Sequence, residues 1–301
     1  MKDRKFYMPT HPGAESQFKV AIARMRVAEE EGETGHFPAT MLSSIIGSKG
    51  LAISDASPYF GSTDSRVVAT LATGHTSTLA YVTESGSSPG GHQFLSNASP
   101  SSGDEALIVG KRGFLVQGTA SGGEPGYSDA YVFTTQLQVS SVDASTGVGF
   151  SCGFLPAGAT ASPLKTAPAN ALYFSFDPTI SDAWVQFSTI YNSGSAVVLD
   201  GVTNPFLNTG GYLAPSAGVD LRLTLAFGQS LDGTNWGWVY VGNYAPGGSG
   251  VKTPMTAAML ANVGSMISAG GIYLAPFVGM YMHGSTQRSL YFQNLIAFAD
   301  K

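Results

Sequence analysis

Paired carboxylates are the first chemistry to look for in this chain of 301 residues. Glycoside hydrolysis needs two Asp or Glu side chains that flank the scissile bond. Every glutamate lies at or before residue 124, at positions 15, 29, 30, 31, 33, 84, 105 and 124. No two of the aspartates after residue 124 are spaced two or four residues apart. We therefore expect no catalytic residues and a protein that is not an enzyme.

A serine nucleophile is suggested only by GSSPG, residues 86–90, which matches the G-x-S-x-G elbow pattern around Ser88. That elbow requires a strand before the serine and a helix after it. Pro89 and Gly90 follow Ser88 instead. The segment is therefore predicted to be a flexible loop.

Side chains that ligate metals are scattered along the chain. The five histidines show no H-x-H or H-E-x-x-H spacing, and only His75 and His92 flank one predicted strand. Calcium could take oxygen ligands from adjacent loops, with the candidates Asp177, Asp182, Asp200, Asn204, Asp232 and Asn235. Asx turns explain the same residues without a metal. We expect no metal and no cofactor.

Aromatic side chains are concentrated in LDGTNWGWVYVGN, residues 231–243. In a strand, Trp236, Trp238 and Tyr240 share one face, while Val239 and Val241 share the other. If the valines point inward, the rings form a strip on which sugars stack, with Asp232 and Asn235 as polar partners. If the rings point inward, they fill the core. Leaving three rings exposed is unfavourable, so burial in the core or at a subunit contact is the favoured prediction.

Composition restricts the partners of the protein. The net charge is −5, and charged residues are 12 % of the chain, whereas a nucleic-acid-binding face would be basic. The single cysteine, Cys152, excludes an internal disulfide framework and is expected to be an inert core thiol. The sequence contains neither a long apolar span nor a secretory signal at its N-terminus. We expect no nucleic acid, no membrane contact and synthesis in a host cytoplasm.

Charge divides the chain into two parts. Twelve of the first 33 residues are charged, against 13 of the 177 residues from 125 to 301. Residues 1–50 are therefore predicted to be an N-terminal arm that attaches the protein to its neighbours.

Within this arm, residues 14–32 are predicted to form a helix, because Phe18, Ile22 and Met25 fall on one stripe. A strand remains open, because Phe18, Val20 and Ile22 also alternate. In either case Phe18, Ile22 and Met25 are the expected assembly contacts.

Residues 51–301 are predicted to form one β-sandwich domain. Short β-rich segments bounded by Gly, Pro and Ser follow one another at regular spacing, which is typical of a sandwich or barrel. The segments are 65–72, 77–84, 105–110, 113–118, 129–140, 147–155, 171–176, 183–191, 195–201, 219–227, 235–242, 271–282 and 289–299. One late helix, about 254–269, is expected, with Thr253 as its N-cap and a buried stripe of Met255, Met259, Val263 and Met266.

The run YFSFD, WVQFSTIYNSGS, VDLRLTLAF, DGTNWGWVYVGN and SLYFQNLIAFAD resembles the concanavalin-A-like lectin/glucanase jelly roll over residues 125–301. This resemblance implies two packed antiparallel sheets. The metal ligands of legume lectins and the catalytic glutamates of the glucanases have no counterparts in this chain, so neither activity is implied.

As a whole the chain resembles tailed-phage virion proteins of the capsid-decoration, fibre or tail type, with low charge, abundant Gly, Ser and Thr, and an N-terminal arm. This resemblance implies a non-enzymatic structural protein located in the virion and assembling, as a homotrimer, with other virion proteins. The alternative is a lectin-like module that binds a host cell-surface glycan through Trp236, Trp238 and Tyr240. An enzyme built on loops is a third, weaker hypothesis.

Overall fold

The computed structural model describes the chain in segments. These are residues 51–53, 67–71, 78–82, 91–110, 113–117, 129–179, 185–199, 215–230, 232–243 and 250–300. The predicted arm, with Phe18, Ile22 and Met25, lies outside the described residues. No helix within the described segments is long and apolar enough to cross a membrane.

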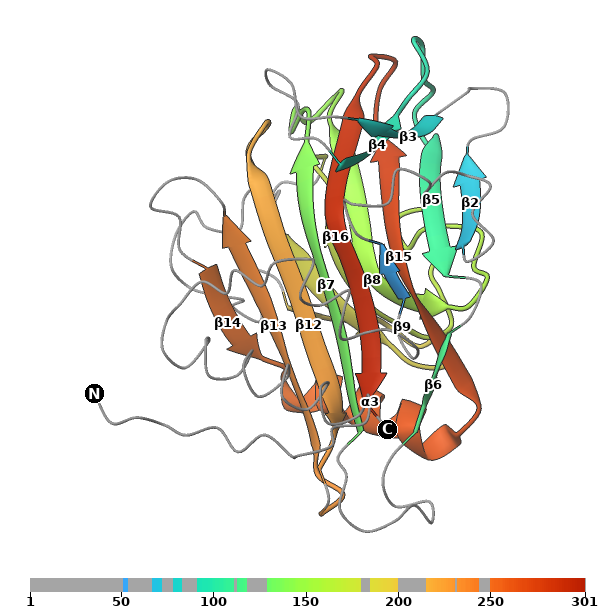
Figure 1. Cartoon of the computed structure of the whole chain (residues 1–301), viewed down its shortest axis with the longest axis vertical. Helices are drawn as coiled ribbons and strands as arrows, with labels where there is room; N and C mark the ends of the chain where they lie inside the picture. The colour runs from blue at the N-terminus through green and yellow to red at the C-terminus, as the bar shows by residue number, and fades with distance from the viewer. Residues whose placement is uncertain are drawn as a thin grey trace, which may run out of the picture.

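Sheet A is antiparallel and has eight strands. From one edge to the other it contains β14 (Gly250–Pro254), β13 (Asn235–Asn243), β12 (Asp220–Gln229), β7 (Asp129–Val139), β16 (Ser289–Asp300), β4 (Gly91–Leu95) and β3 (Thr78–Val82), while β1 (Leu51–Ile53) pairs with β16. Figure 1 shows this sheet with β14 at its edge, next to β13 and β12.

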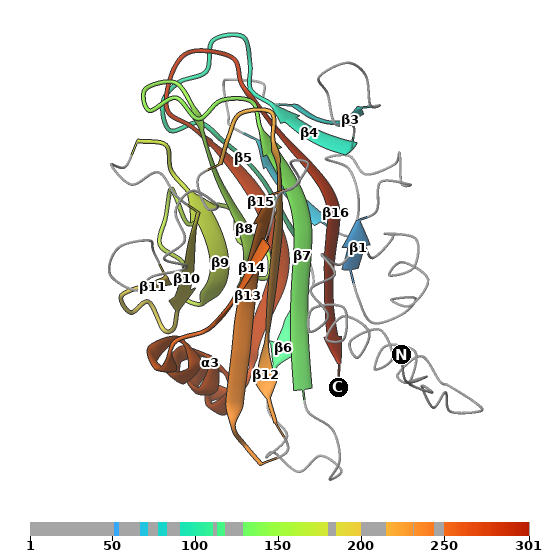
Figure 2. The ribbon, with the colours of Figure 1, turned by 90° about the vertical axis from the view of Figure 1, so that its left-hand side faces the viewer.

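Sheet B is also antiparallel and eight-stranded. Its order is β11 (Val197–Leu199), β10 (Gln186–Ile190), β9 (Ala171–Phe176), β8 (Val148–Pro156), β15 (Ile272–Met282), β5 (Glu105–Gly110) and β2 (Val67–Leu71), while β6 (Phe114–Val116) pairs with β15. Figure 2 shows the two sheets as face-to-face layers. The predicted mainly β, two-sheet sandwich is confirmed.

The core lies between the sheets and is formed by alternate residues of each strand. Leu221, Leu223, Leu225 and Phe227 of β12 point into it, and their side chains are at most 1 % exposed. From sheet B, the ring of Phe154 packs edge-on against Phe227, with 5.8 Å between ring centroids. The alternation in the sequence thus produces one apolar face per strand.

The outer face of sheet B is covered by the chain that follows β8. Glu105, 2 % exposed, accepts a hydrogen bond from the backbone N–H of Ser162 (3.1 Å) and lies 3.7 Å from Lys165 Nζ. Gly149 and Gly279 leave room for Leu164 and Ser162 on this face. The central strands of sheet B are consequently buried on both sides.

One helix, α3 (Ala257–Ala269), lies among the described residues and packs against β13 and β10 at one end of the sandwich (Figure 2). Its N-cap is Thr256, whose hydroxyl accepts a hydrogen bond from Met259 N (3.3 Å). The prediction of Thr253 as the N-cap is wrong, because residues 250–254 pair with β13 as an edge strand and the helix begins after them. The predicted apolar stripe is buried, at Met255, Met259, Val263 and Met266.

Candidate functional site

The three rings of β13 point away from the core. Val239 and Val241 are fully buried between the sheets, whereas Trp236, Trp238 and Tyr240 are half-buried on the opposite, outer face of sheet A. The favoured prediction is burial in the core or at a subunit contact, and the structure shows that burial in the core is wrong. The reason lies in the neighbouring strand, because Leu223 and Leu225 pair with Val241 and Val239 and bring the valines to the core face. We call Trp236, Trp238 and Tyr240 the aromatic strip.

The two predicted polar partners, Asp232 and Asn235, lie in different places relative to the aromatic strip. Asp232 is exposed in the turn before β13, where its carboxylate accepts a hydrogen bond from Thr234 N (2.9 Å). The hydrogen bonds from Thr234 lower the pKa of Asp232. Asn235 has the core-side parity of Val239, accepts a hydrogen bond from Gln229 Nε2 (3.2 Å) and contacts α3 at Gly264. Asp232 thus lies at one end of the strip, and Asn235 lies behind it.

Lys252 is a member of the site that the sequence did not reveal. It is exposed on β14, is paired in register with Tyr240, and places its Nζ 4.4 Å from the ring centroid of Trp238. Lys252 was missed because the sequence did not predict β14: GVKTP is short, begins with a glycine and ends in Pro254. Proline is tolerated in an edge strand such as β14.

Tyr240 is positioned by the glycine that follows it on the same face. A Cβ atom at Gly242 would lie 2.6 Å from Tyr240 Oη, so the ring occupies the space that a side chain would need. Gly242 pairs with Arg222 of β12. The phenol therefore lies over Gly242, whose neighbour on β12 is Arg222, half-buried on the outer face.

A polar band continues from this end of the strip across sheet A. Asp220 accepts hydrogen bonds from Gln136 Nε2 (2.8 Å) and Gln138 Nε2 (3.2 Å). Burial raises the pKa of Asp220, and these two hydrogen bonds oppose the rise. Further along the same row, Gln93 Nε2 donates to Tyr291 Oη (2.9 Å). Amide, carboxylate and phenol groups of this kind fix the orientation of a polar ligand.

The middle of the outer face is closed. Thr134 and Thr224 hydrogen-bond to each other through their hydroxyls (2.9 Å), and both are less than 10 % exposed. Ala226 and Val132, in the adjacent row, are also buried. The accessible part of the site therefore lies over β13 and β14.

Other candidate residues have structural explanations. His92 points into the core from β4, and its ring stacks on Phe292 with 5.3 Å between ring centroids. Burial lowers the pKa of His92 to about 4. Cys152 is fully buried, and burial raises the pKa of its thiol, as expected for an inert core residue. His75 and Ser88 lie outside the described residues.

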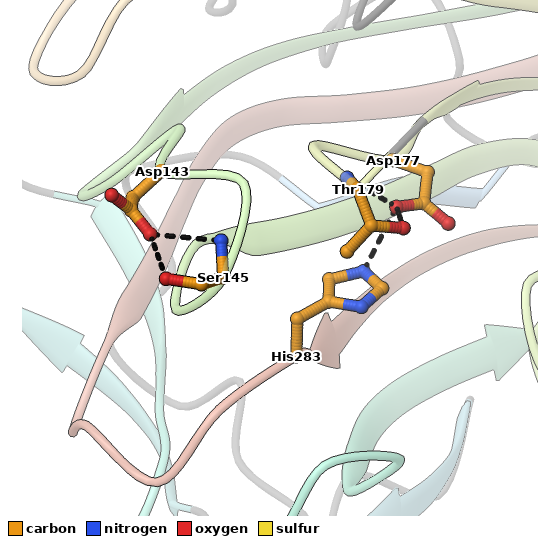
Figure 3. Close-up of polar contacts among 5 residues, drawn as sticks. All are labelled: Asp143, Ser145, Asp177, Thr179 and His283. Carbon is orange, nitrogen blue, oxygen red and sulfur yellow. Dashed lines mark hydrogen bonds and ion pairs between the residues drawn. The ribbon is translucent and has the colours of Figure 1, made fainter. Parts of the chain in front are cut away.

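Two loop carboxylates at the other end of the sandwich accept hydrogen bonds within local turns (Figure 3). Asp177 Oδ1 accepts hydrogen bonds from the backbone N–H and hydroxyl of Thr179 and lies 3.1 Å from His283 Nε2. Asp143 accepts hydrogen bonds from Ser145, which lower its pKa to about 2. In the part of the chain that the structure describes, no three His, Cys, Asp or Glu residues are grouped to hold a metal ion. Asp182, Asp200 and Asn204 lie outside it.

Comparison with solved structures finds legume lectins and a lectin-like protein. A peanut lectin structure, with a 9mer peptide, matches 84 % of this chain and 99 % of its own at 10 % identity and a TM-score of 0.49. Lectin II from Ulex europaeus matches 84 % and 100 % at 9 % identity and a TM-score of 0.44. Arcelin-5, a lectin-like defense protein from Phaseolus vulgaris, matches 84 % and 98 % at 9 % identity and a TM-score of 0.46. No protein-family model and no curated protein matches the chain.

Proposed function

We propose that this protein is a non-enzymatic, lectin-like module that binds carbohydrate on the outer face of sheet A, over β13 and β14. One observation carries the proposal: Trp236, Trp238 and Tyr240 share the outer face while Val239 and Val241 of the same strand are fully buried. The strip is built on a rigid strand that pairs on both sides, with β12 and β14. This pairing fixes the backbone positions from which the three rings project.

The chemistry of the strip suits a sugar. Tyr and Trp side chains combine a flat apolar face with a polar edge, and pyranose rings present C–H groups on one face and hydroxyls around the rim. Asp220, Gln136 and Gln138 lie on the same outer face. Asp220 and Gln136 are half-buried and can serve as hydrogen-bond partners for hydroxyl groups beyond the strip, whereas Gln138 is buried.

Binding without cleavage is the activity that this set of side chains supports. Among the described residues, Asp220 and Asp232 are the carboxylates near the strip, and they lie beyond its opposite ends. Hydrolysis by the usual mechanisms needs two carboxylates that flank the scissile bond at a defined separation.

The virion role, the homotrimer and attachment through residues 1–50 stay predictions. They depend on the arm, which lies outside the described residues. No contact in the described segments favours them over glycan binding.

Tryptophan fluorescence tests the proposal, because two of the three tryptophans belong to the strip. A panel of soluble plant, fungal and bacterial polysaccharides is titrated into the protein, and hits are measured again by calorimetry. Trp238→Ala should weaken binding about tenfold or more, which corresponds to about 1.4 kcal/mol. Tyr273→Ala, at an aromatic residue that is 53 % exposed on sheet B, is the control and should bind normally. Normal binding by a folded Trp238→Ala variant would contradict the proposed site.

A further inference from the structure

We infer that the preferred ligand of the aromatic strip is an acidic polysaccharide, one whose sugars carry carboxylates. This inference rests on the proposed carbohydrate-binding function and narrows it to a class of glycan. It follows from two cations, Lys252 and Arg222, that the fold places beside the strip on the neighbouring strands.

Lys252 is part of the surface that a sugar would meet. Its Nζ lies 4.4 Å from the centroid of the Trp238 ring, and the residue is exposed. A neutral sugar that packs on Trp238 must move this ammonium and give up its attraction to the ring. An acidic sugar packs beside the same ring and pairs its carboxylate with the ammonium, so the cation–π contact becomes part of the binding site.

A second cation lies beyond the Tyr240 end of the strip. Arg222 is on the outer face and pairs in register with Gly242, over which the Tyr240 ring extends. Gly242 is four residues from Trp238, which corresponds to about 13 Å along a strand. A polymer with a carboxylate on successive sugars can therefore meet one cation over the middle ring of the strip, Trp238, and another beyond its Tyr240 end.

Two described carboxylates lie near the strip, Asp232 at its Trp236 end and Asp220 beyond its Tyr240 end, and both accept hydrogen bonds from within the protein. Both oxygens of Asp220 accept amide hydrogen bonds, from Gln138 to Oδ1 and from Gln136 to Oδ2. The chain as a whole carries a net charge of −5, which opposes non-specific attraction of polyanions. Retention of an acidic glycan must consequently come from local contacts at the strip.

The test uses matched pairs of polysaccharides that differ only in charge: polygalacturonate, alginate and hyaluronan, each with its carboxyl-reduced form. Fluorescence titration of the full chain should show at least one acidic form binding about tenfold tighter than its neutral partner. Lys252→Met keeps the stem and removes the charge, and should reduce that preference to less than about threefold. Lys252→Arg should retain it. Lys165→Met, at a half-exposed lysine beside Glu105 on the other sheet, should also retain it.

Each result separates this inference from the proposed function. Equal binding of acidic and neutral forms, or binding only of neutral glycans from the wider panel, overturns the acidic preference and leaves carbohydrate binding intact. Binding of polyglutamate as tightly as the acidic glycan also overturns it, because charge alone would then suffice. An unchanged preference in a folded Lys252→Met variant removes Lys252 from the site. Failure of every polysaccharide in the wider panel to bind contradicts the proposed function itself.

Discussion

Gly242 shows how much one residue controls in the proposed site. It sits beside Tyr240 on the outer face, and its missing side chain leaves space for the phenol ring. A methyl group there would meet the far end of a flexible side chain rather than the backbone. The φ of Gly242 is not in the left-handed region, so backbone conformation does not require a glycine here. The space taken by the Tyr240 ring does.

Gly242→Ala should displace the Tyr240 ring, weaken glycan binding several-fold and leave the melting temperature within a few degrees of the wild type. Gly237→Ala is the matched control on the opposite face of the same strand, where the new methyl group would meet Met255. This control should lower stability and leave binding unchanged. Near-UV circular dichroism, thermal melts and glycan titration measure the three effects. Unchanged binding by Gly242→Ala would show that the position of Tyr240 does not matter to the ligand.

His92 should make stability depend on pH. Burial lowers its pKa from 6.5 to about 4 in the folded state, so between these values the unfolded chain binds the proton more tightly. The stabilisation is complete above about pH 6.5 and is lost as the pH falls toward 4, by on the order of 3 kcal/mol. Urea unfolding at a series of pH values should show a shallower decline for His92→Gln than for the wild type. Parallel curves would mean that other groups dominate the acid response.

At the scale of elements, the junction between β14 and α3 separates two threonines that look alike in the sequence. Thr256 caps the helix, whereas the hydroxyl of Thr253 is buried and has no hydrogen-bond partner among the described residues. Thr256→Ala should therefore destabilise the fold by about 1 kcal/mol. Thr253→Val removes an unpaired buried hydroxyl and should be neutral or stabilising by up to about 1 kcal/mol. Urea unfolding measures the stability of both variants. A larger loss of stability in Thr253→Val than in Thr256→Ala would indicate that Thr253 is the cap.

At the scale of the whole molecule, the two sheets differ in how far the rest of the chain covers their outer faces. Residues 157–170 cover the outer face of sheet B, over a second apolar cluster that includes Tyr173 and Phe277. The buried carboxylate of Glu105 fixes this segment through Ser162 N. Sheet B thereby becomes the closed layer, and the aromatic strip lies on the outer face of sheet A.

Glu105→Leu should loosen that cover, because it leaves the Ser162 N–H unpaired. The expected loss of stability is about 2 kcal/mol, together with faster hydrogen exchange in residues 157–170. Lys165→Met is the control and should change stability by less than about 1 kcal/mol, because an ion pair with one exposed partner contributes little. Hydrogen exchange followed by mass spectrometry reads both variants. Unaltered exchange in Glu105→Leu would mean that apolar packing alone holds the segment.

The sequence by itself determined the class of fold and the partition of each strand into two faces. Alternation in 219–227 and 235–242 is a local property of the pleated backbone, so it identified which side chains lie together, including the three rings. The late helix and its apolar stripe followed from spacing in the same way. The edge strand β14 did not, because GVKTP carries no alternating pattern and gains its strand conformation from pairing with β13.

Only the tertiary structure decided which face of β13 meets the core and which residues surround the rings. Periodicity is symmetric between the two faces, and the choice depends on long-range pairing of Val239 and Val241 with the leucines of β12. The pairing of β13 with its neighbours places Asn235 behind the strip and places Lys252, Arg222 and Asp220 beside it. The latter three belong to the strands before and after β13, so their place beside Trp238 depends on the register of the pairing between strands and on no pattern within one strand.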